Sequence, residues 1–161
     1  MLSSWSRELG FIFYRLLKLI REMNAADINA LADIYYQSRI ATFDWMNPDE
    51  IQLDDFHRDT DGERIWVAEV KSHIVGFISA CEAESFIHHL FVLPAYASQG
   101  VGSQLPATCL SYISRPATLK CVSANTNALS FYKQKGWKTI DYGTSDGVEY
   151  QIMQLITSLV E

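Results

Sequence analysis

The feature that most constrains this chain is an apolar stretch that runs into a Gly-x-Gly turn, with a helical pattern directly after it. The stretch is residues 90–93, and the turn is residues 100–102. A helix N-terminus carries N–H groups without intrahelical acceptors and a partial positive charge, so it can hold a phosphate without a basic side chain. Glycine has no Cβ, which lets the backbone approach such an anion closely. Most Gly-x-Gly pairs only mark turns, so the rest of the chain has to decide between the two interpretations.

The length and composition indicate one globular domain. The chain has 161 residues, of which 48% are hydrophobic and 20% charged, which suits a single buried core. A net charge of -6 argues against nucleic-acid binding; it either favours a cationic, amine-bearing partner or only keeps the protein in solution. Cys81, Cys109 and Cys121 are odd in number without a Cys-x-x-Cys pair. They fit buried thiols in a reducing cytoplasm better than a disulfide or zinc framework.

The N-terminal residues are expected to form an extension, over residues 1–13, ahead of a single domain over residues 14–161. The apolar run at residues 11–20 is interrupted by Arg15 and Lys18. It therefore contains no stretch of about 20 uncharged residues that could span a bilayer. An extension that leads into a first strand is favoured over a membrane anchor or a signal peptide.

Hydrophobic patterning predicts the following elements. Strands are expected at residues 14–21, 65–70, 74–83, 86–93, 119–123, 137–142 and 148–156. Helices are expected after Asp27 as N-cap, at residues 49–58, at 103–114 with Pro106 in the first turn, and at 126–135, where Gly136 ends the helix. This order predicts an α/β or α+β layered fold, in which helices cover a mixed sheet.

A second informative block begins at Asn125, where a strand gives way to a helix. The Asn125 side chain can cap that helix or bond a ligand amide. Ala128 and Tyr132 lie four residues apart and share a helix face with Phe131. The small side chain at 128 leaves room for a ligand against the helix, with Tyr132 at its end. The alternative is that Phe131 and Tyr132 are ordinary core aromatics.

The two blocks together resemble the GNAT superfamily of N-acetyltransferases. The first is strand-Gly-x-Gly-helix, and the second, starting 25 residues after Gly100, is Asn-x-x-Ala-x-x-Phe-Tyr-x-x-x-Gly-Trp. The resemblance covers residues 19–155 and implies a mixed, mostly antiparallel sheet of six to seven strands. Helices would cover both faces of this sheet, and a central strand pair would splay apart. Acetyl-CoA would lie between the strands at 86–93 and 119–123.

The resemblance assigns cofactor contacts to individual positions. Backbone groups of Phe91 and Val92 would pair with the pantetheine and acetyl portions, and Asn125 would contact the pantetheine arm. Ala128 and Phe131 would lie against the cofactor. The N–H groups around the pyrophosphate would be those of Gln99, Gly100, Val101, Gly102 and Ser103.

Three positions depart from the family pattern. Ala97 stands where Arg or Gln is usual, and Ser98 where Gly is frequent, while Pro106 replaces a common aliphatic residue. Without a cationic side chain at 97 the phosphates should bind more weakly, although the helix-terminal amides remain. The departures concern affinity for CoA rather than the fold.

Two residues are candidates for proton transfer in the implied reaction. Tyr132 matches the tyrosine that protonates the departing CoA thiolate in many relatives. A protonated amine cannot attack a thioester, so a base is also needed, and the position of His88 faces the acceptor in the family layout. An imidazole titrates near physiological pH, which suits this role; the alternative is that His88 only packs or hydrogen-bonds, with His89 as the next candidate. Neighbouring strand residues should point to opposite faces, which counts against a shared metal site for the two histidines.

The acceptor side is the least determined part of the site. Phe43 and Trp45, beside Asp44, fall in a loop that lines the acceptor side in relatives, where they could hold a cationic amine or only anchor the loop. Glu84, like Glu82, could complement substrate charge or be a solvated strand-end carboxylate.

The sequence thus predicts a cytoplasmic, acetyl-CoA-dependent N-acetyltransferase without a metal. It would transfer the acetyl group directly to a small or peptide amine in a ternary complex. The fold allows a homodimer, and neither nucleic acid nor membrane is expected as a partner. The alternative is a CoA-binding sensor or regulatory module without turnover.

Overall fold

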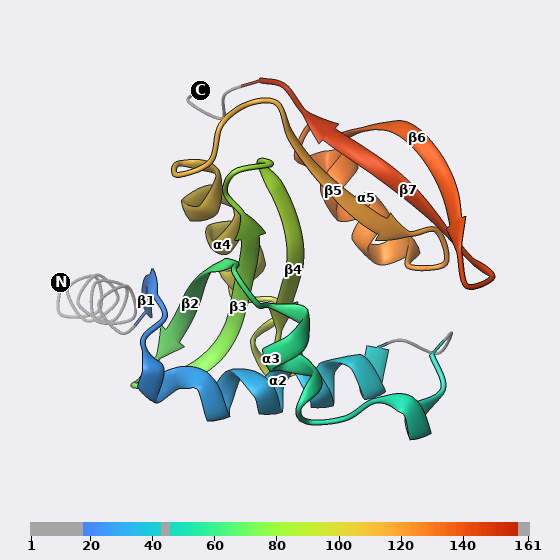
Figure 1. Cartoon of the computed structure of the whole chain (residues 1–161). Helices are drawn as coiled ribbons and strands as arrows, with labels where there is room; N and C mark the ends of the chain where they lie inside the picture. The colour runs from blue at the N-terminus through green and yellow to red at the C-terminus, as the bar shows by residue number, and fades with distance from the viewer. Residues whose placement is uncertain (1–17, 43–45, 158–161) are drawn as a thin grey trace, which may run out of the picture.

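The computed structural model describes residues 18–42 and 46–157, which form one seven-stranded sheet covered by helices (Figure 1). The strand order is β1-β2-β3-β4-β5-β7-β6. The strands are β1 (Lys18–Glu22), β2 (Arg64–Val70), β3 (His73–Cys81), β4 (Phe86–Val92), β5 (Ala117–Val122), β6 (Lys138–Ser145) and β7 (Val148–Leu155). The helices are α2 (Ile28–Thr42), α3 (Asp55–Asp59), α4 (Val101–Leu110) and α5 (Thr126–Gln134), with short 3-10 turns η1 (Ala25–Asp27), η2 (Pro48–Glu50) and η3 (Pro94–Tyr96).

The sheet is mixed and mostly antiparallel, as expected. Among the described strands β4 and β5 form the single parallel pair, and the pairing covers two positions, Phe86 with Thr118 and Ile87 with Leu119. Beyond these pairs the two strands diverge, which Figure 1 shows as a separation between the β1–β4 half and the β5–β7–β6 half of the sheet. The predicted splayed central pair is therefore confirmed.

Two hydrophobic cores lie on opposite faces of the sheet. On the α4 face, Trp66 and Ile78 pack with Leu105 of α4. On the α2 face, Leu31 of α2 packs with Phe77 of β3. Alternation along β2 and β3 supplies both faces, because successive side chains of a strand point in opposite directions. Burial on both faces makes this half of the sheet a rigid support for the end of β4.

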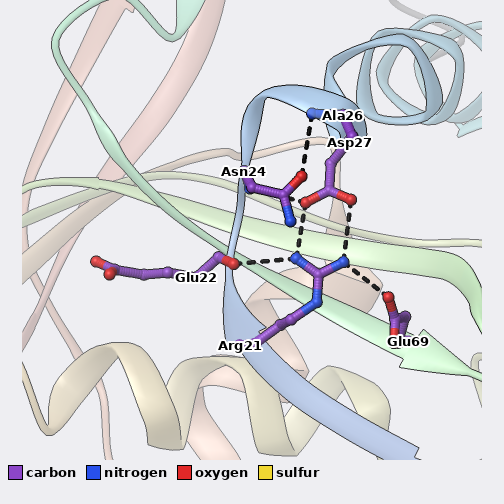
Figure 2. A network of polar contacts seen from close by, with 6 residues as sticks. All are labelled: Arg21, Glu22, Asn24, Ala26, Asp27 and Glu69. Atoms are coloured by element: carbon purple, nitrogen blue, oxygen red, sulfur yellow. Dashed lines mark hydrogen bonds and ion pairs between the residues drawn. The ribbon is translucent and has the colours of Figure 1, made fainter.

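The entry into α2 is organised by an ion-pair network around Arg21 (Figure 2). Its guanidinium donates to the two carboxylate oxygens of Asp27 at 2.7 and 3.0 Å and to Glu69 of β2 at 2.7 Å. Asn24 caps η1 by accepting from the Ala26 N–H at 3.0 Å, while Asp27 accepts from the Asn24 N–H at 2.8 Å. The prediction of Asp27 as N-cap is wrong. Asp27 is instead the third residue of a capping box, and it pairs with Arg21 of β1, which in turn pairs with Glu69 of β2.

Several element boundaries differ from the expected ones. Helix α4 starts at Val101 and ends at Leu110, so Pro106 lies in its second turn rather than its first. Since proline has no N–H, it cannot donate to the carbonyl four residues before it. The helix expected at residues 49–58 is divided into η2 and α3. Residues 1–13, the first part of the predicted strand 14–21, and the loop residues Phe43 and Trp45 lie outside the described residues. No helix in the described ranges has the length and apolarity needed to cross a membrane.

The cysteines are free thiols, as their spacing predicted. Cys109 and Cys121 are buried, and Cys81 is partly buried. Burial raises the pKa of Cys109 to about 12 and that of Cys121 to about 11. Both therefore stay in the thiol form at neutral pH.

Candidate active site

The site lies in a cleft that opens where β4 and β5 diverge. The cavity measures about 740 Å³. Its walls come from α2, β4, β5 and α5, and they include Tyr35, His88, His89, Asn125, Ala128 and Tyr132. Residues of the strand predicted at 86–93 and of the helix predicted at 126–135 are thereby brought to one cavity.

The exposed edge of β4 forms one wall of this cleft. After Ile87 no described residue of β5 pairs with β4, so the peptide groups on that edge can bond a ligand in the manner of an added strand. Phe91 lines the cleft, and Val92 is paired with Gly76 of β3 on the other edge. A Cβ at Gly76 would come within 2.8 Å of the Phe91 carbonyl oxygen. Glycine at this position therefore permits the close approach of β3 and β4 behind the cleft.

The Gly-x-Gly turn forms the start of α4. Gly100 is the N-cap residue with φ of +81°, a conformation that favours glycine, and no side chain caps the helix. No described residue has an atom within 4 Å of a Cβ placed at Gly100 or Gly102, so the described part of the chain leaves the helix N-terminus open to an anion. The turn residues 99–103 do not line the cavity itself. The structure thus places the Gly-x-Gly turn apart from the cavity.

A lysine that sequence reasoning missed lies beside this turn. The Nζ of Lys18, at the start of β1, donates to the backbone carbonyl of Gln99. The ammonium group brings positive charge to the turn, in which Ala97 carries none. The contact joins residues 81 positions apart in the chain, so no local pattern could have indicated it.

The helix that follows β5 presents the second predicted block to the cleft. The Asn125 side chain caps α5 by accepting from the Ala128 N–H at 3.2 Å, which confirms the capping interpretation. Both residues also line the cavity. Phe131 does not line it, but its ring contacts that of Tyr132 at a centroid distance of 5.3 Å.

Tyr132 stands at the cleft as a protonated phenol. Its ring is held edge-on against Trp137, at 5.8 Å between centroids. Burial raises the pKa of the Tyr132 hydroxyl above its ordinary value, and the nearby Cys121 thiol acts in the same direction. The hydroxyl therefore keeps its proton across the neutral pH range.

The two adjacent histidines of β4 share a face, contrary to expectation. Ser79 of β3 pairs with His89, whereas Ala80 pairs with Ile87, so His88 is an extra residue in a β-bulge. Ile87 belongs to the core of the α4 face. The two imidazoles both line the cleft, with 5.9 Å between ring centroids. The prediction that they point to opposite faces is wrong because a bulge interrupts the two-residue alternation on which it rested.

A buried carboxylate, Glu63, lies against both histidines. Its Oε1 contacts Nδ1 of His88, and its Oε2 lies 3.6 Å from Nδ1 of His89. His89 Nδ1 also shares a hydrogen bond of 2.8 Å with Ser79 Oγ. Burial alone would raise the pKa of Glu63, but the neighbouring His89 and Ser79 side chains, with the charge of the two imidazoles, hold it below its ordinary value. Sequence reasoning missed Glu63, since a lone glutamate before a strand carries no distinguishing signal.

A smaller hollow of about 370 Å³ adjoins η2 and the β6–β7 hairpin. Its charged lining residues are Glu50, Lys120 and Asp146, and the Lys120 ammonium lies 4.0 Å from the centre of the Tyr150 ring. Glu84 is exposed in the turn between β3 and β4 and lines neither hollow. Within the described ranges no three His, Cys, Asp or Glu side chains are grouped so as to hold a metal ion.

Comparison with known proteins gives consistent results. The family model described as an acetyltransferase (GNAT) domain matches residues 31–157. An uncharacterized N-acetyltransferase of Archaeoglobus fulgidus is 27% identical, over 78% of this chain and 97% of the relative.

Solved structures share the fold. The apo-form of YjaB from Escherichia coli has a TM-score of 0.73 at 24% identity and covers 88% of this chain and 99% of its own. The putative acetyltransferase yncA from Salmonella typhimurium, solved with its cofactor acetyl-CoA, has a TM-score of 0.67 at 18% identity, with coverage of 89% and 95%.

Proposed function

The chain belongs to the GNAT acetyltransferase family, and on this premise we propose that it transfers the acetyl group of acetyl-CoA to a primary amine by direct attack in a ternary complex. The observation that carries the proposal is the meeting of Tyr132 with the histidine pair of β4 in one cavity. A protonated phenol and a neutral imidazole are the acid and base that aminolysis of a thioester requires.

The cleft fits the parts of acetyl-CoA. The helix N-terminus at Gly100 suits the pyrophosphate, because its amides need no further cation. The edge of β4 that diverges from β5 after Ile87 suits the amides of the pantetheine arm, and Phe91 and Val92 lie towards its end. Ala128, at the start of α5, leaves space for the arm beside the helix.

In the proposed reaction, three groups of the chain act on the reacting atoms: the His88 imidazole, the Val92 N–H and the Tyr132 hydroxyl. Nε2 of His88 takes one proton from the ammonium group of the acceptor, and the freed lone pair forms the C–N bond. The carbonyl oxygen gains the displaced electron pair, and the Val92 N–H stabilises this oxyanion. When the C–S bond breaks, its electrons stay on sulfur, which takes the proton of Tyr132. The nitrogen gives its second proton to solvent, Tyr132 is reprotonated from solvent, and His88 returns its proton to solvent, so that one proton is released per turnover.

The proposal is tested in two steps on the full chain. Calorimetric titration with acetyl-CoA should give saturable one-site binding, and a free-thiol assay over a panel of small amines and peptide N-termini should then show amine-dependent release of CoA. Binding without release for any acceptor would support a CoA-binding sensor instead. Absence of binding would contradict both functions.

The nature of the amine stays a prediction. The cleft carries both signs of charge, from Asp59 and Asp146 on one hand and Arg39 and Lys120 on the other. This composition supports a small or peptide amine with a polar group near its nitrogen. A cytoplasmic location and a homodimer also stay predictions.

A further inference from the structure

The histidine pair and Glu63 form a graded arrangement from the interior to the cleft. The exposed fraction of the side chain is 5% for Glu63, 17% for His89 and 39% for His88. The carboxylate is therefore shielded from water behind the two imidazoles. A buried carboxylate is costly unless it is paired. Among the described residues, the side chains that interact with the Glu63 carboxylate are His88, His89 and Ser79, which indicates a role in the site.

The contact atoms determine which nitrogen of His88 is available. A carboxylate against Nδ1 accepts a hydrogen bond from that nitrogen, so the ring proton of the neutral imidazole lies on Nδ1. The lone pair is then on Nε2, the nitrogen away from Glu63. The same carboxylate also stabilises the imidazolium that forms when Nε2 takes a proton.

We propose that Glu63 is the positioning residue of the base: it fixes the Nδ1–H form of His88 and stabilises the protonated ring during acetyl transfer. The proposal rests on the function proposed above and deepens it. It also gives the bulge at His88 a function, because regular alternation would have turned this imidazole to the other face of β4.

His89 has a different place in the arrangement. Its Nδ1 is bonded to buried Ser79 at 2.8 Å and lies 3.6 Å from Glu63 Oε2. Its ring is fixed edge-on against Tyr35, at 5.2 Å, and beside Phe91, at 6.2 Å. These contacts hold the His89 ring in one orientation beside Oε2 of Glu63. His88 is then the imidazole that is available to the acceptor amine.

The other charged groups around the pair are engaged with one another. From α2 and α3, Tyr35 donates to Asp59 at 2.7 Å, and Arg39 pairs with Asp55 at 3.0 Å. Arg64, next to Glu63 in the chain, pairs with Glu22 and Glu82. Lys120 and Asp146 face the pair from the other wall of the cleft. Glu63 is thus the acid in contact with the imidazoles.

The test uses Glu63→Gln, which keeps the shape of the side chain and removes its charge. The matched control is Glu22→Gln, an exposed acid paired with Arg64. In Glu63→Gln, kcat/KM at neutral pH should fall about 10- to 100-fold, and the midpoint of its acid limb should move to lower pH. Glu63→Asp should recover part of the loss, and Glu22→Gln should change neither quantity.

Histidine NMR supplies a readout that does not depend on turnover. In the wild-type chain, nitrogen shifts of the His88 ring should place the neutral-form proton on Nδ1, and in Glu63→Gln the titration midpoint of His88 should move to lower pH. A proton on Nε2 in the wild type, or an unchanged midpoint in a folded variant, would overturn the role of Glu63. Absence of amine-dependent CoA release by the wild type would contradict the proposed function instead, and the NMR result would still decide the pairing.

Discussion

The hydroxyl of Tyr35 donates a hydrogen bond of 2.7 Å to Oδ2 of Asp59, which joins α2 to the last residue of α3 at the wall of the cleft. The ring of Tyr35 contacts His89 and Phe91 edge-on, at 5.2 and 5.4 Å between centroids. Burial raises the pKa of the Tyr35 hydroxyl, and the bond to Asp59 adds to this effect. The bond is therefore intact throughout the pH range in which the protein would work.

The two functions of Tyr35, its ring contacts and its hydroxyl bond, can be separated by mutation. Tyr35→Phe keeps the ring and should lower the free energy of unfolding by about 1 kcal/mol. Tyr35→Ala also removes the support of His89 and should cost about 3–5 kcal/mol. Urea denaturation measures the free energy of unfolding of both variants. An equal decrease in the two variants would show that packing of the Tyr35 ring contributes nothing to stability.

Tyr132→Phe tests the proposed acid. The variant keeps the aromatic contacts with Phe131 and Trp137, so acetyl-CoA should bind as before. The rate constant kcat should fall about 100-fold, because the thiolate would leave without a proton donor. Tyr112→Phe is the control, since Tyr112 is exposed and stacks on Trp66 outside the cleft. An unchanged kcat in Tyr132→Phe would remove this residue from the mechanism.

The two glycines of the turn should respond differently to alanine. Gly100 has φ of +81°, so Gly100→Ala should destabilise the protein by about 1–2 kcal/mol and weaken acetyl-CoA binding by tilting the first N–H groups of α4. Gly102 lies within the helix with open space around it, so Gly102→Ala should be tolerated and should raise stability by up to about 1 kcal/mol. Thermal unfolding measures the stability of the two variants, and calorimetry measures their affinity for acetyl-CoA. Equal effects of both substitutions would contradict a special requirement for glycine at position 100.

Ala97→Arg tests whether the turn proposed to hold the pyrophosphate lacks positive charge. The exposed side chain at 97 precedes the turn, and a guanidinium there should tighten acetyl-CoA binding by about 1.5–3 kcal/mol if it reaches the phosphates. The gain should diminish at high salt. Ala95→Arg, also exposed, serves as the control for a general increase in positive charge. A tighter complex in both variants would indicate nonspecific attraction.

Asp27→Asn tests the network around Arg21. The hydrogen bond and charge of Arg21 hold the pKa of Asp27 below its ordinary value, in spite of burial. The ion pair therefore contributes stability above the pKa of an unfolded aspartate, about 3.9, and this contribution is lost as the pH falls through the lower pKa of the folded state. Asp27→Asn should cost about 1.5–3 kcal/mol at neutral pH, and the difference from wild type should shrink in acid. A difference that is constant with pH would contradict an ionic contribution.

Local patterns predicted the elements that local interactions determine. Helix α5 was expected at residues 126–135 and is found at Thr126–Gln134, with Asn125 as its cap and Gly136 at φ of +94° after it. Both signals act within one turn of the helix end. The strand before the Gly-x-Gly turn was likewise predicted within one residue of Phe86–Val92.

The acid–base part of the site could not be predicted in this way. The bulge at His88 depends on how β4 pairs with β3, and neither strand alone contains a signal for it. Glu63 meets His88 across 25 positions of the chain, so its role appears only when β2 and β4 lie in one sheet. The misassigned cap has a similar cause, since Asn24 and Asp27 are both good capping residues and the pairing of Asp27 with Arg21 is tertiary.

Direct transfer is the central claim, and following a labelled acetyl group tests it most directly. Enzyme mixed with excess acetyl-labelled acetyl-CoA, without acceptor, should carry no covalent label after quenching, because Cys121 at the cleft stays a thiol with a pKa of about 11. Addition of an accepted amine should move the label to the amine in equal amount to the CoA released. Label that remains on the protein, or that appears as acetate independently of the amine, would contradict direct acetyl transfer.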